Sequence, residues 1–273
     1  MIANTGDDAE VYGVHVSPDP DLVTYWLADA IDERGYGIRD DTWEVMDALE
    51  RAGRPAWFRL GDRDLAMCLV RTELLRGGTR LTEAHGAVVD AMGAEARVLP
   101  MSDEPVATEV TSRGRRLPLQ EFMIVERAEG PIEGVELVGL ESARPTPEAL
   151  AVLADAEAIV IGPSNPVISI GPILAVPGMR EAVAGSSAPV VAVSPFVGGR
   201  AIKGPTDAFC DFAGIARGAG GIARAYEGLL DGIVADEPVD GLPTLVIDTL
   251  MDTPERRREV AKRTLEFARS LDA

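Results

Sequence analysis

The feature that most constrains the fold is a set of short, uninterrupted apolar stretches in the second half of the chain. They alternate with helical patterns and cover Ala158–Ile161, Pro189–Val193 and Thr244–Ile247. Strands that are apolar on both sides are typical of a parallel sheet whose two faces are covered by helices. The chain therefore belongs to the α/β class. We expect its last helix to begin after Thr253 and to bury the stripe Val260, Thr264, Phe267 and Leu271.

The first half of the chain predicts four helices. Capping residues, apolar spacing and terminal glycines mark their limits. The first two are expected over Asp21–Asp32 and over Thr42–Ala52, the latter with Asp41 as N-cap. The third is capped by Asp62, carries Leu65, Cys68, Leu69 and Leu75, and ends at Gly77-Gly78. The fourth covers Thr82–Met92 and ends before Gly93.

Residues 95–145 interrupt this alternation. Strands are expected at Glu95–Leu99, Val106–Thr111 and Leu117–Val125, the last two joined by the turn Arg113-Gly114-Arg115. We interpret 95–145 as a small β-rich insertion in an α/β core made of 1–94 and 146–273. The core resumes with a helix from Pro147 to about Ala156, capped by Thr146.

Composition excludes several classes of protein. The 273 residues include 26 basic and 45 acidic side chains, a net charge of −19, and 46% of them are hydrophobic. Such apolar content argues against disorder, and such charge argues against nucleic-acid or anionic-membrane partners. Lysine occurs only at Lys203 and Lys262. An acidic, lysine-poor surface suits a salt-rich cytoplasm, and codon bias explains it equally well.

The sequence shows no sign of export or of a cysteine-based metal site. The first residues contain no signal-peptide pattern, and no apolar run approaches the roughly 18 residues that a membrane span needs. Cys68 and Cys210 are far apart, and His15 and His85 form no familiar zinc spacing with them. We expect two reduced thiols and a cytoplasmic protein.

Two loops that follow apolar strands are candidate anion sites, because ligands bind beyond the carboxyl ends of parallel strands. One follows Ile161 and contains Ser164 and Asn165, whose side chains and backbone suit a phosphate. The other follows Val193 and contains Arg200 and Lys203 among glycines. A plain strand–helix connection and two solvated surface cations are the alternatives.

Carboxylates near the amino terminus form the third candidate site. Asp7-Asp8 and the segment Ser17-Pro18-Asp19-Pro20-Asp21 offer oxygen ligands for Mg²⁺, although acidic pairs are common in so acidic a chain. Arg63, between Asp62 and Asp64 at an expected helix start, is a candidate contact for an anionic or carbonyl group. A helix cap with a surface ion pair is the alternative.

Taken together, these segments resemble the 2-phospho-L-lactate transferases of coenzyme F-420 biosynthesis. The resemblance runs in order along essentially the whole chain, and seven matches in register make it specific. The matching segments are Ala3–Asp8, Ser17–Asp21, Trp57–Asp64, Leu99–Asp103, Gly162–Pro166 with Ser169–Gly178, Ala192–Pro195 and Asp248–Met251. The resemblance also indicates that the α/β fold is Rossmann-like, with three layers around a parallel sheet.

The resemblance implies an activity and a set of roles. Enzymes of this family move a phospho-acid from a guanosine diphosphate-linked donor to the side-chain hydroxyl of the deazaflavin Fo, release GMP and require Mg²⁺. Asp7 and Asp21 fall at the family's metal and Fo site, Arg63 on its Fo-contacting arginine, and Ser164 and Asn165 in the donor loop. Arg200 and Lys203 are expected as diphosphate partners. Our hypothesis is that Mg²⁺ held by Asp7 and Asp21 bridges the donor diphosphate. We expect Asp21→Asn to abolish turnover and leave the fold intact.

Other interpretations stay open at this stage. The family usually has a strand, a glycine-rich turn and a helix before the Asn4–Asp8 segment, so a misplaced start or an inactive, truncated relative is conceivable. Pro20 replaces the usual leucine and can open the following helix. A nucleotide-sugar-sensing regulator of related fold is the alternative class. The donor acid (phospholactate or phosphoenolpyruvate) and a homodimeric state are not decided by the sequence.

Overall fold

A computed structural model describes residues 1–202 and 204–271 of the chain. These residues form a mixed α/β fold that divides into two compact units, Met1–Ala149 and Leu150–Ala273. Each unit has its own sheets and is described by itself. No helix among the described residues has both the length and the apolar character needed to cross a membrane.

The second unit contains the predicted parallel sheet. Its strand order is β13-β12-β9-β8, and every neighbouring pair is parallel. The strands are β8 (Ile159–Ile161), β9 (Val190–Val193), β12 (Gly232–Ala235) and β13 (Thr244–Val246). Three of them coincide with the apolar stretches predicted from sequence, whereas β12 was missed.

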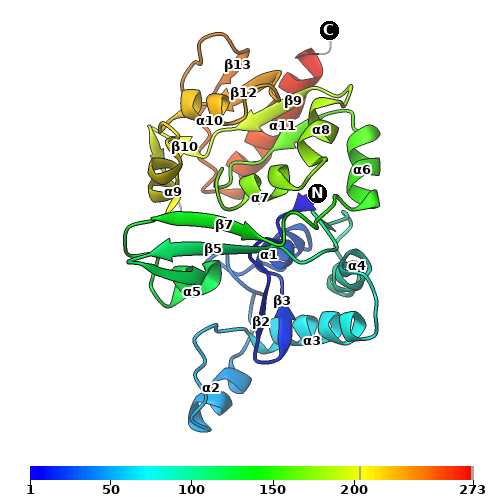
Figure 1. Ribbon diagram of the computed structural model, residues 1–273. Helices are drawn as coiled ribbons and strands as arrows, with labels where there is room; N and C mark the ends of the chain where they lie inside the picture. Colours follow the sequence, from blue (N-terminus) through cyan, green and yellow to red (C-terminus); the bar gives the residue numbers. More distant parts are fainter. Residues whose placement is uncertain (203, 272–273) are drawn as a thin grey trace. The chain divides into compact units, whose positions relative to one another are not determined.

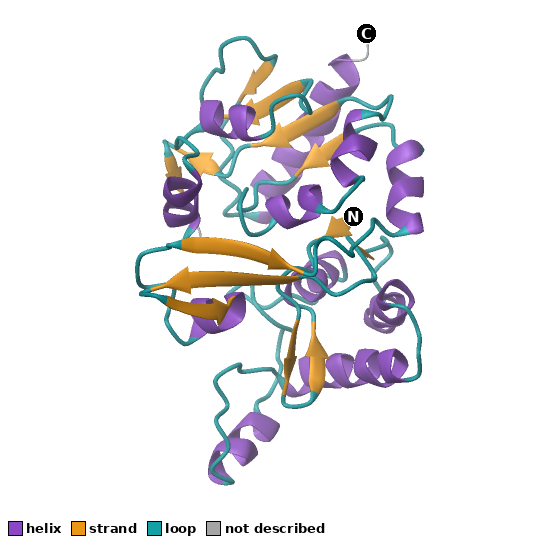
Figure 2. Ribbon diagram, in the orientation of Figure 1, coloured by secondary structure: helices purple, strands orange, loops and turns teal. Residues whose placement is uncertain are grey.

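Helices cover this sheet, as Figures 1 and 2 show. Along α11 (Pro254–Leu271), Val260 and Ala268 are buried against Val191 and Val234 of the sheet. The other helices are α6 (Pro147–Ala154), which begins in the first unit, α7 (Ile170–Ala175), α8 (Met179–Ala184), α9 (Thr206–Ala213) and α10 (Ala219–Ala225). A short hairpin pairs β10 (Phe196–Val197) with β11 (Arg200–Ala201).

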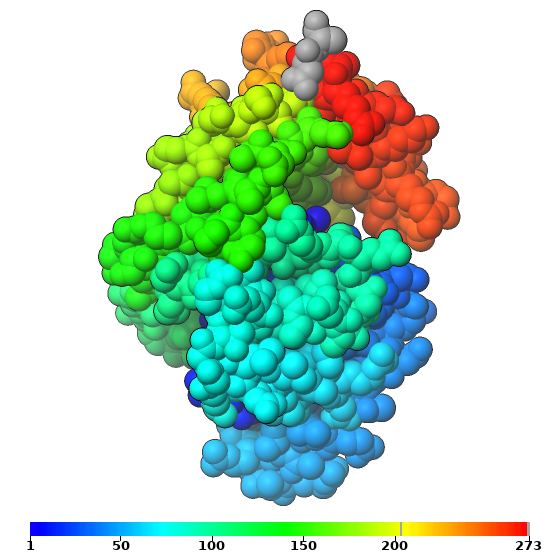
Figure 3. Space-filling view, turned by 90° about the vertical axis from the view of Figure 1, so that its right-hand side faces the viewer, coloured from blue at the N-terminus to red at the C-terminus, as the bar shows by residue number. Residues whose placement is uncertain are grey.

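The first unit combines small sheets with helices. The parallel pair β1 (Ile2–Ala3) and β4 (Leu99–Pro100) and the antiparallel hairpin of β2 (Ala9–Val11) and β3 (Val14–Val16) carry the amino-terminal segment. The helices are α1 (Pro18–Leu27), α2 (Glu44–Arg51), α3 (Asp62–Arg76) and α4 (Leu81–Met92). The α3 and α4 helices pack side by side. Figure 3 shows their cyan segment at the molecular surface.

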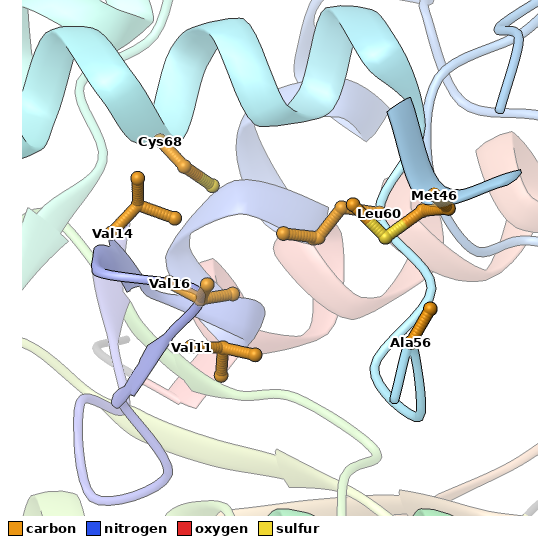
Figure 4. Close-up of a cluster of buried hydrophobic side chains, with 7 residues drawn as sticks. All are labelled: Val11, Val14, Val16, Met46, Ala56, Leu60 and Cys68. Carbon is orange, nitrogen blue, oxygen red and sulfur yellow. The ribbon is translucent and has the colours of Figure 1, made fainter. Parts of the chain in front are cut away.

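A hydrophobic cluster joins the β2–β3 hairpin to α2 and α3. Val11, Val14 and Val16 of the hairpin belong to one cluster with Cys68 of α3, and Met46, Leu60 and Ala56 extend it (Figure 4). The alternation of Val14, His15 and Val16 buries the valines and leaves the histidine on the other face. This packing fixes the segment that continues into the Ser17–Asp21 motif.

The β-rich segment of the first unit differs in part from the prediction. β5 (Ala107–Ser112) lies between β6 (Arg115–Pro118) and β7 (Gly134–Val138) in an antiparallel sheet. The strand expected over Leu117–Val125 is confirmed only for Leu117–Pro118, which belong to β6 and pair with β5. The rest of it is wrong, because Leu119–Ile124 forms a helix, α5. A short apolar run has no period that separates a strand from a buried helix. The strand expected over Glu95–Leu99 is confined to Leu99–Pro100.

In the first unit, some predicted helix limits agree with the structure and others do not. α3 and α4 end before Gly77 and Gly93 as expected, and Gly93 adopts the left-handed conformation (φ 70°) that favours glycine after a helix. α1 begins at Pro18, three residues before the predicted start, because its first turn accepts proline. The caps predicted for α2 and α3 are reversed, and this reversal shapes the site.

Candidate active site

The loop after β1 forms the centre of the site. Asn4 donates its side-chain amide to Asp7 (Nδ2 to Oδ1, 3.2 Å) and to Asp19 (Nδ2 to Oδ2, 3.0 Å). Its own Oδ1 accepts the backbone N–H of Gly6 at 2.7 Å, which closes the loop. One buried amide therefore brings the carboxylates of Asp7 and Asp19 together.

The surroundings of these carboxylates raise their pKa values. Burial raises the pKa of Asp7 well above its usual value, and the neighbouring charges of Asp19 and Asp8 raise it further. Burial also raises the pKa of Asp19 and of Asp8. His15 and Ser17 partly offset the effect on Asp8, to which they hydrogen bond at 2.9 and 2.7 Å. Three adjacent carboxylates of this kind favour a bound cation.

Two buried hydroxyls beside the loop have no hydrogen-bond partner among the described residues. They belong to Thr5 and Thr108, each only 2% exposed. Thr108 lies on β5, and its backbone N–H donates to the carbonyl of Gly6 at 2.5 Å. Buried polar groups are normally satisfied, and an exception indicates water or a bound ligand. Together with the carboxylates, these hydroxyls fit the oxygen-rich surroundings of a hydrated divalent cation.

Arg71, on α3, holds the carboxylate of Asp21. Its Nη1 and Nη2 donate to the two oxygens at 2.6 and 2.8 Å, and Nη2 also donates to the carbonyl of His15 at 3.0 Å. The side chain of Arg71 is fully buried. Such a two-point contact fixes the orientation of a carboxylate. Asp21 therefore has a different partner from Asp7.

His85, on α4, supports this pair as a neutral imidazole. Burial lowers its pKa to about 4. Thr24 donates to the carbonyl of Pro20 at 2.8 Å and therefore accepts from Nε2 of His85 at 3.1 Å. This arrangement leaves Nδ1 of His85 as an acceptor for Nη1 of Arg71, at 3.5 Å.

Asp64 and Cys68 lie close to Asp21. One ligand atom from each of the three residues lies within 4.8 Å of the others. Arg71 occupies this group, however, because it binds Asp21 and donates to the sulfur of Cys68 at 3.6 Å. A second cation is therefore disfavoured there. Burial and the nearby Asp21 charge raise the pKa of Asp64 to about 7, while a hydrogen bond from Tyr25 (2.7 Å) opposes this shift.

Asp41 and Asp62 cap each other's predicted helices. The carboxylate of Asp62 accepts the backbone N–H groups of Glu44 and Val45 at the start of α2, both at 3.0 Å. The carboxylate of Asp41 accepts those of Arg63 and Asp64 at the start of α3, at 2.9 and 3.1 Å. The predicted caps, Asp41 for the second helix and Asp62 for the third, are therefore corrected. The exchange ties the two loops together.

Arg63 is exposed within this crossed arrangement. Its guanidinium donates one hydrogen bond, from Nη1 to the carbonyl of Arg39 at 3.1 Å. Gly61 allows the approach of Asp41, because a Cβ at this position would overlap the Asp41 carboxylate. Arg63 is thus presented to solvent from a fixed backbone.

In the second unit, Asn165 builds the loop after β8. Its Oδ1 accepts the backbone N–H groups of Val167 and Ile168 at 2.8 and 3.2 Å, and its Nδ2 donates to Oγ1 of Thr206 at 3.4 Å. Asn165 is buried, and Ser164 beside it is exposed. Arg200 is exposed on β11, and Lys203 lies outside the described residues. Thr249, after β13, is buried and has a hydroxyl with no partner in the described part of the chain.

Comparison with known proteins identifies the family. The model of the family described as 2-phospho-L-lactate transferase CofD matches residues 1–251. The chain belongs to this family.

Relatives and solved structures agree with this assignment. Proteins named phosphoenolpyruvate transferase from Mycobacterium avium and Mycobacterium leprae are both 38% identical, over 98% of this chain and 84% and 85% of their own lengths. The one from Mycobacterium tuberculosis is 37% identical and covered to 86%. Two crystal structures of protein BH3568 from Bacillus halodurans, one described as a member of the UPF0052 family, share the fold. They give TM-scores of 0.61 and 0.59 at 17% and 18% identity, over 97% of this chain and 90% of theirs.

For this CofD-family chain, the resemblance inferred from sequence and the transferase class are confirmed. The individual site roles of Asp7, Asp21, Arg63, Ser164, Asn165, Arg200 and Lys203 stay predictions. The structure brings Asp7 together with Asp19, which the sequence analysis placed in an acidic segment without giving it a role. It also adds Arg71 and Gln120, which contact Asp21 and Asp7.

A compositional signal points to some of these residues. Asn4, Gln120 and Asn165 are the only side-chain amides of the chain. Each makes a hydrogen bond in one of the candidate loops.

Proposed function

We propose that this protein transfers a phospho-acid, 2-phospho-L-lactate or phosphoenolpyruvate, from a guanosine diphosphate-linked donor to the side-chain hydroxyl of Fo. The products are coenzyme F-420-0, or its dehydro form, and GMP. Family membership and the names of the relatives support the transferase class. The single observation that carries the proposal is the loop in which Asn4 joins Asp7 and Asp19 beside two unpartnered buried hydroxyls.

We assign Mg²⁺ to this loop. Asp7 and Asp19 supply hard oxygen ligands. Burial and neighbouring carboxylates raise their pKa values, so a bound cation would stabilise their charged forms. We place Asp19 where the sequence analysis placed Asp21, because Arg71 already contacts both Asp21 oxygens. When bound, Mg²⁺ supplies the positive charge that lets an anionic diphosphate lie against carboxylates.

The acceptor is assigned to Asp21 and Arg63. Arg71 fixes the Asp21 carboxylate, and each of its oxygens keeps a lone pair for a further hydrogen bond. Arg63 is exposed, and its remaining N–H groups suit the carbonyl groups of a deazaflavin ring. These residues bind and orient the acceptor, which is the main requirement of phosphoryl-group transfer.

Donor contacts in the second unit are proposed separately. Asn165 orders the loop after β8 through its bonds to Val167 and Ile168, which leaves Ser164 exposed for a phosphate oxygen. Arg200 and Lys203 are proposed as further anion contacts. These assignments rest on the position of the loops after parallel strands.

Turnover with defined substrates tests the proposal. Purified protein is incubated with Fo and either donor, with Mg²⁺ or with EDTA, and the product is identified by mass spectrometry. We expect a product carrying the donor acid and GMP in equal amounts, only with Mg²⁺. Asp7→Asn and Asp19→Asn are expected to lower kcat at least 100-fold, whereas the exposed Asp90→Asn is the matched control. Binding of a uridine nucleotide sugar without any turnover of Fo would instead indicate a regulator.

A further inference from the structure

We call the loop between β1 and β2, residues 4–8, the cation loop. A side chain of the β-rich segment of the first unit, which contains β5, β6, α5 and β7, contacts this loop. Gln120, on α5, donates from Nε2 to Oδ2 of Asp7 at 2.9 Å, across 113 positions of sequence. Asn4 holds the other oxygen, Oδ1, of the same carboxylate. The plane of the Asp7 carboxylate is therefore fixed by two amides that come from different parts of the fold.

The same segment makes a second contact with this loop. The backbone N–H of Thr108 on β5 donates to the carbonyl of Gly6, next to Asp7. The Thr108 hydroxyl is buried and has no partner within the described residues. β5 and α5 are in contact, so one piece of structure carries both residues.

We propose that Gln120 is a positioning residue for cation binding, which it supports by orienting Asp7, and that the Thr108 hydroxyl binds a water of the hydrated cation. The proposal rests on the proposed function, because it takes the Asp7 loop as the Mg²⁺ site. It adds the β5–α5 segment to that site.

Physical reasons favour an amide at position 120. A neutral donor orients the carboxylate without neutralising it, so Asp7 keeps its charge for a cation. An arginine or lysine there would compete with the metal, and a carboxylate would repel Asp7. Residues that orient metal ligands through a hydrogen bond typically change metal affinity 10- to 100-fold when they are replaced.

Binding of Mn²⁺ to the full chain, without Fo or donor, tests the proposal. Free Mn²⁺ is counted by electron paramagnetic resonance, and the melting temperature of each variant verifies folding. We expect Gln120→Met, which keeps the side-chain length but removes the donor, to weaken Mn²⁺ binding about tenfold. Glu121→Gln, at the next position of α5, serves as the control and is expected to bind like the wild type. In turnover, we expect Gln120→Met to raise the Mg²⁺ concentration needed for half-maximal rate, while kcat at saturating Mg²⁺ falls much less.

Thr108→Val gives a second, nearly isosteric test. We expect it to weaken Mn²⁺ binding as well, whereas Thr111→Val, on the same strand, leaves it unchanged. Equal Mn²⁺ affinity of the wild type, Gln120→Met and Thr108→Val would overturn the inference and leave the proposed function standing. If the wild-type protein itself binds no Mn²⁺, the assignment of the cation loop fails, and the roles of Gln120 and Thr108 fail with it.

Discussion

Arg71 donates to both carboxylate oxygens of Asp21, at 2.6 and 2.8 Å, from a guanidinium that is fully buried. The pair links α3 to the first turns of α1. A buried ion pair of this kind is costly to break from one side, because the remaining charge stays in a poorly solvated position. Asp21 therefore contributes to stability whatever its role toward the substrate.

The first prediction concerns this ion pair. We expect Asp21→Asn to lower the free energy of unfolding by about 3–5 kcal/mol, since it leaves the Arg71 charge without its partner. Urea denaturation at pH 7 measures the loss. This replaces the expectation from sequence that the variant keeps an intact fold.

A double variant separates stability from function. Asp21→Asn combined with Arg71→Met removes both charges and is expected to recover part of the lost stability, because no unpaired buried charge remains. Turnover is expected to stay low in both. A single Asp21→Asn variant that is as stable as the wild type would contradict the assignment.

The second prediction concerns Gly61. A Cβ at this position would overlap the carboxylate of Asp41, which caps α3 at Arg63 and Asp64. We expect Gly61→Ala to cost about 1–2 kcal/mol, in line with the loss of a helix cap, and to weaken binding of Fo by displacing Arg63. Thermal melting and Fo fluorescence titration measure the two effects.

Gly86 supplies the matched control for Gly61. It lies inside α4, and an added Cβ meets nothing within 4 Å. Gly86→Ala is therefore expected to stabilise the protein by about 0.5–1 kcal/mol. If both alanine variants behave alike, the close approach of Asp41 does not constrain Gly61.

Sequence reasoning located the elements that depend on local pattern. β8, β9 and β13 lie within one residue of the predicted limits, because continuous apolar stretches mark buried strands. β12 was missed although all four of its residues are buried, since it begins with Gly232 and glycine weakens the pattern of a strand.

The arrangement of the site residues could be predicted less well, because it depends on contacts between segments that are far apart in the sequence. Asp41 and Asp62 each carry a capping signal, but the helix that each one caps is decided by how two loops cross. Gln120 lies 113 positions from Asp7, and no spacing rule connects them. Asn4 pairs Asp7 with Asp19, whereas Arg71, which lies on a different helix, binds Asp21. The sequence alone does not show which of the two aspartates lies beside Asp7.

The third prediction concerns pH. The pKa of Asp64 is raised to about 7 in the folded protein, above roughly 3.9 for an unfolded chain. Its protonated form is therefore favoured by folding, so its contribution to stability is complete below pH 4 and is lost as the pH rises to about 7. We expect Asp64→Asn to reduce the fall in melting temperature between pH 5 and pH 8. The amide oxygen of the variant can still accept from Tyr25. An unchanged pH dependence would show that Asp64 titrates normally.

The fourth prediction concerns the cation loop. Burial and mutual repulsion raise the pKa values of Asp7, Asp8 and Asp19, so protons compete with a cation for these carboxylates. We expect Mg²⁺ to raise the melting temperature, because it binds the folded loop, and to do so more strongly as the pH rises and the carboxylates lose their protons. Calorimetric melting with and without saturating Mg²⁺ measures the effect.

Variants of the loop decide whether the effect arises there. Asp19→Asn removes one carboxylate but keeps an oxygen that can accept from Asn4, so the folded loop is preserved. This variant is expected to be more stable than the wild type without Mg²⁺, since one repulsive charge is gone, and to gain much less from its addition. Asp90→Asn, exposed on α4, removes the same charge elsewhere and is expected to respond to Mg²⁺ like the wild type. An equal Mg²⁺ response in all three proteins would place the cation outside this loop.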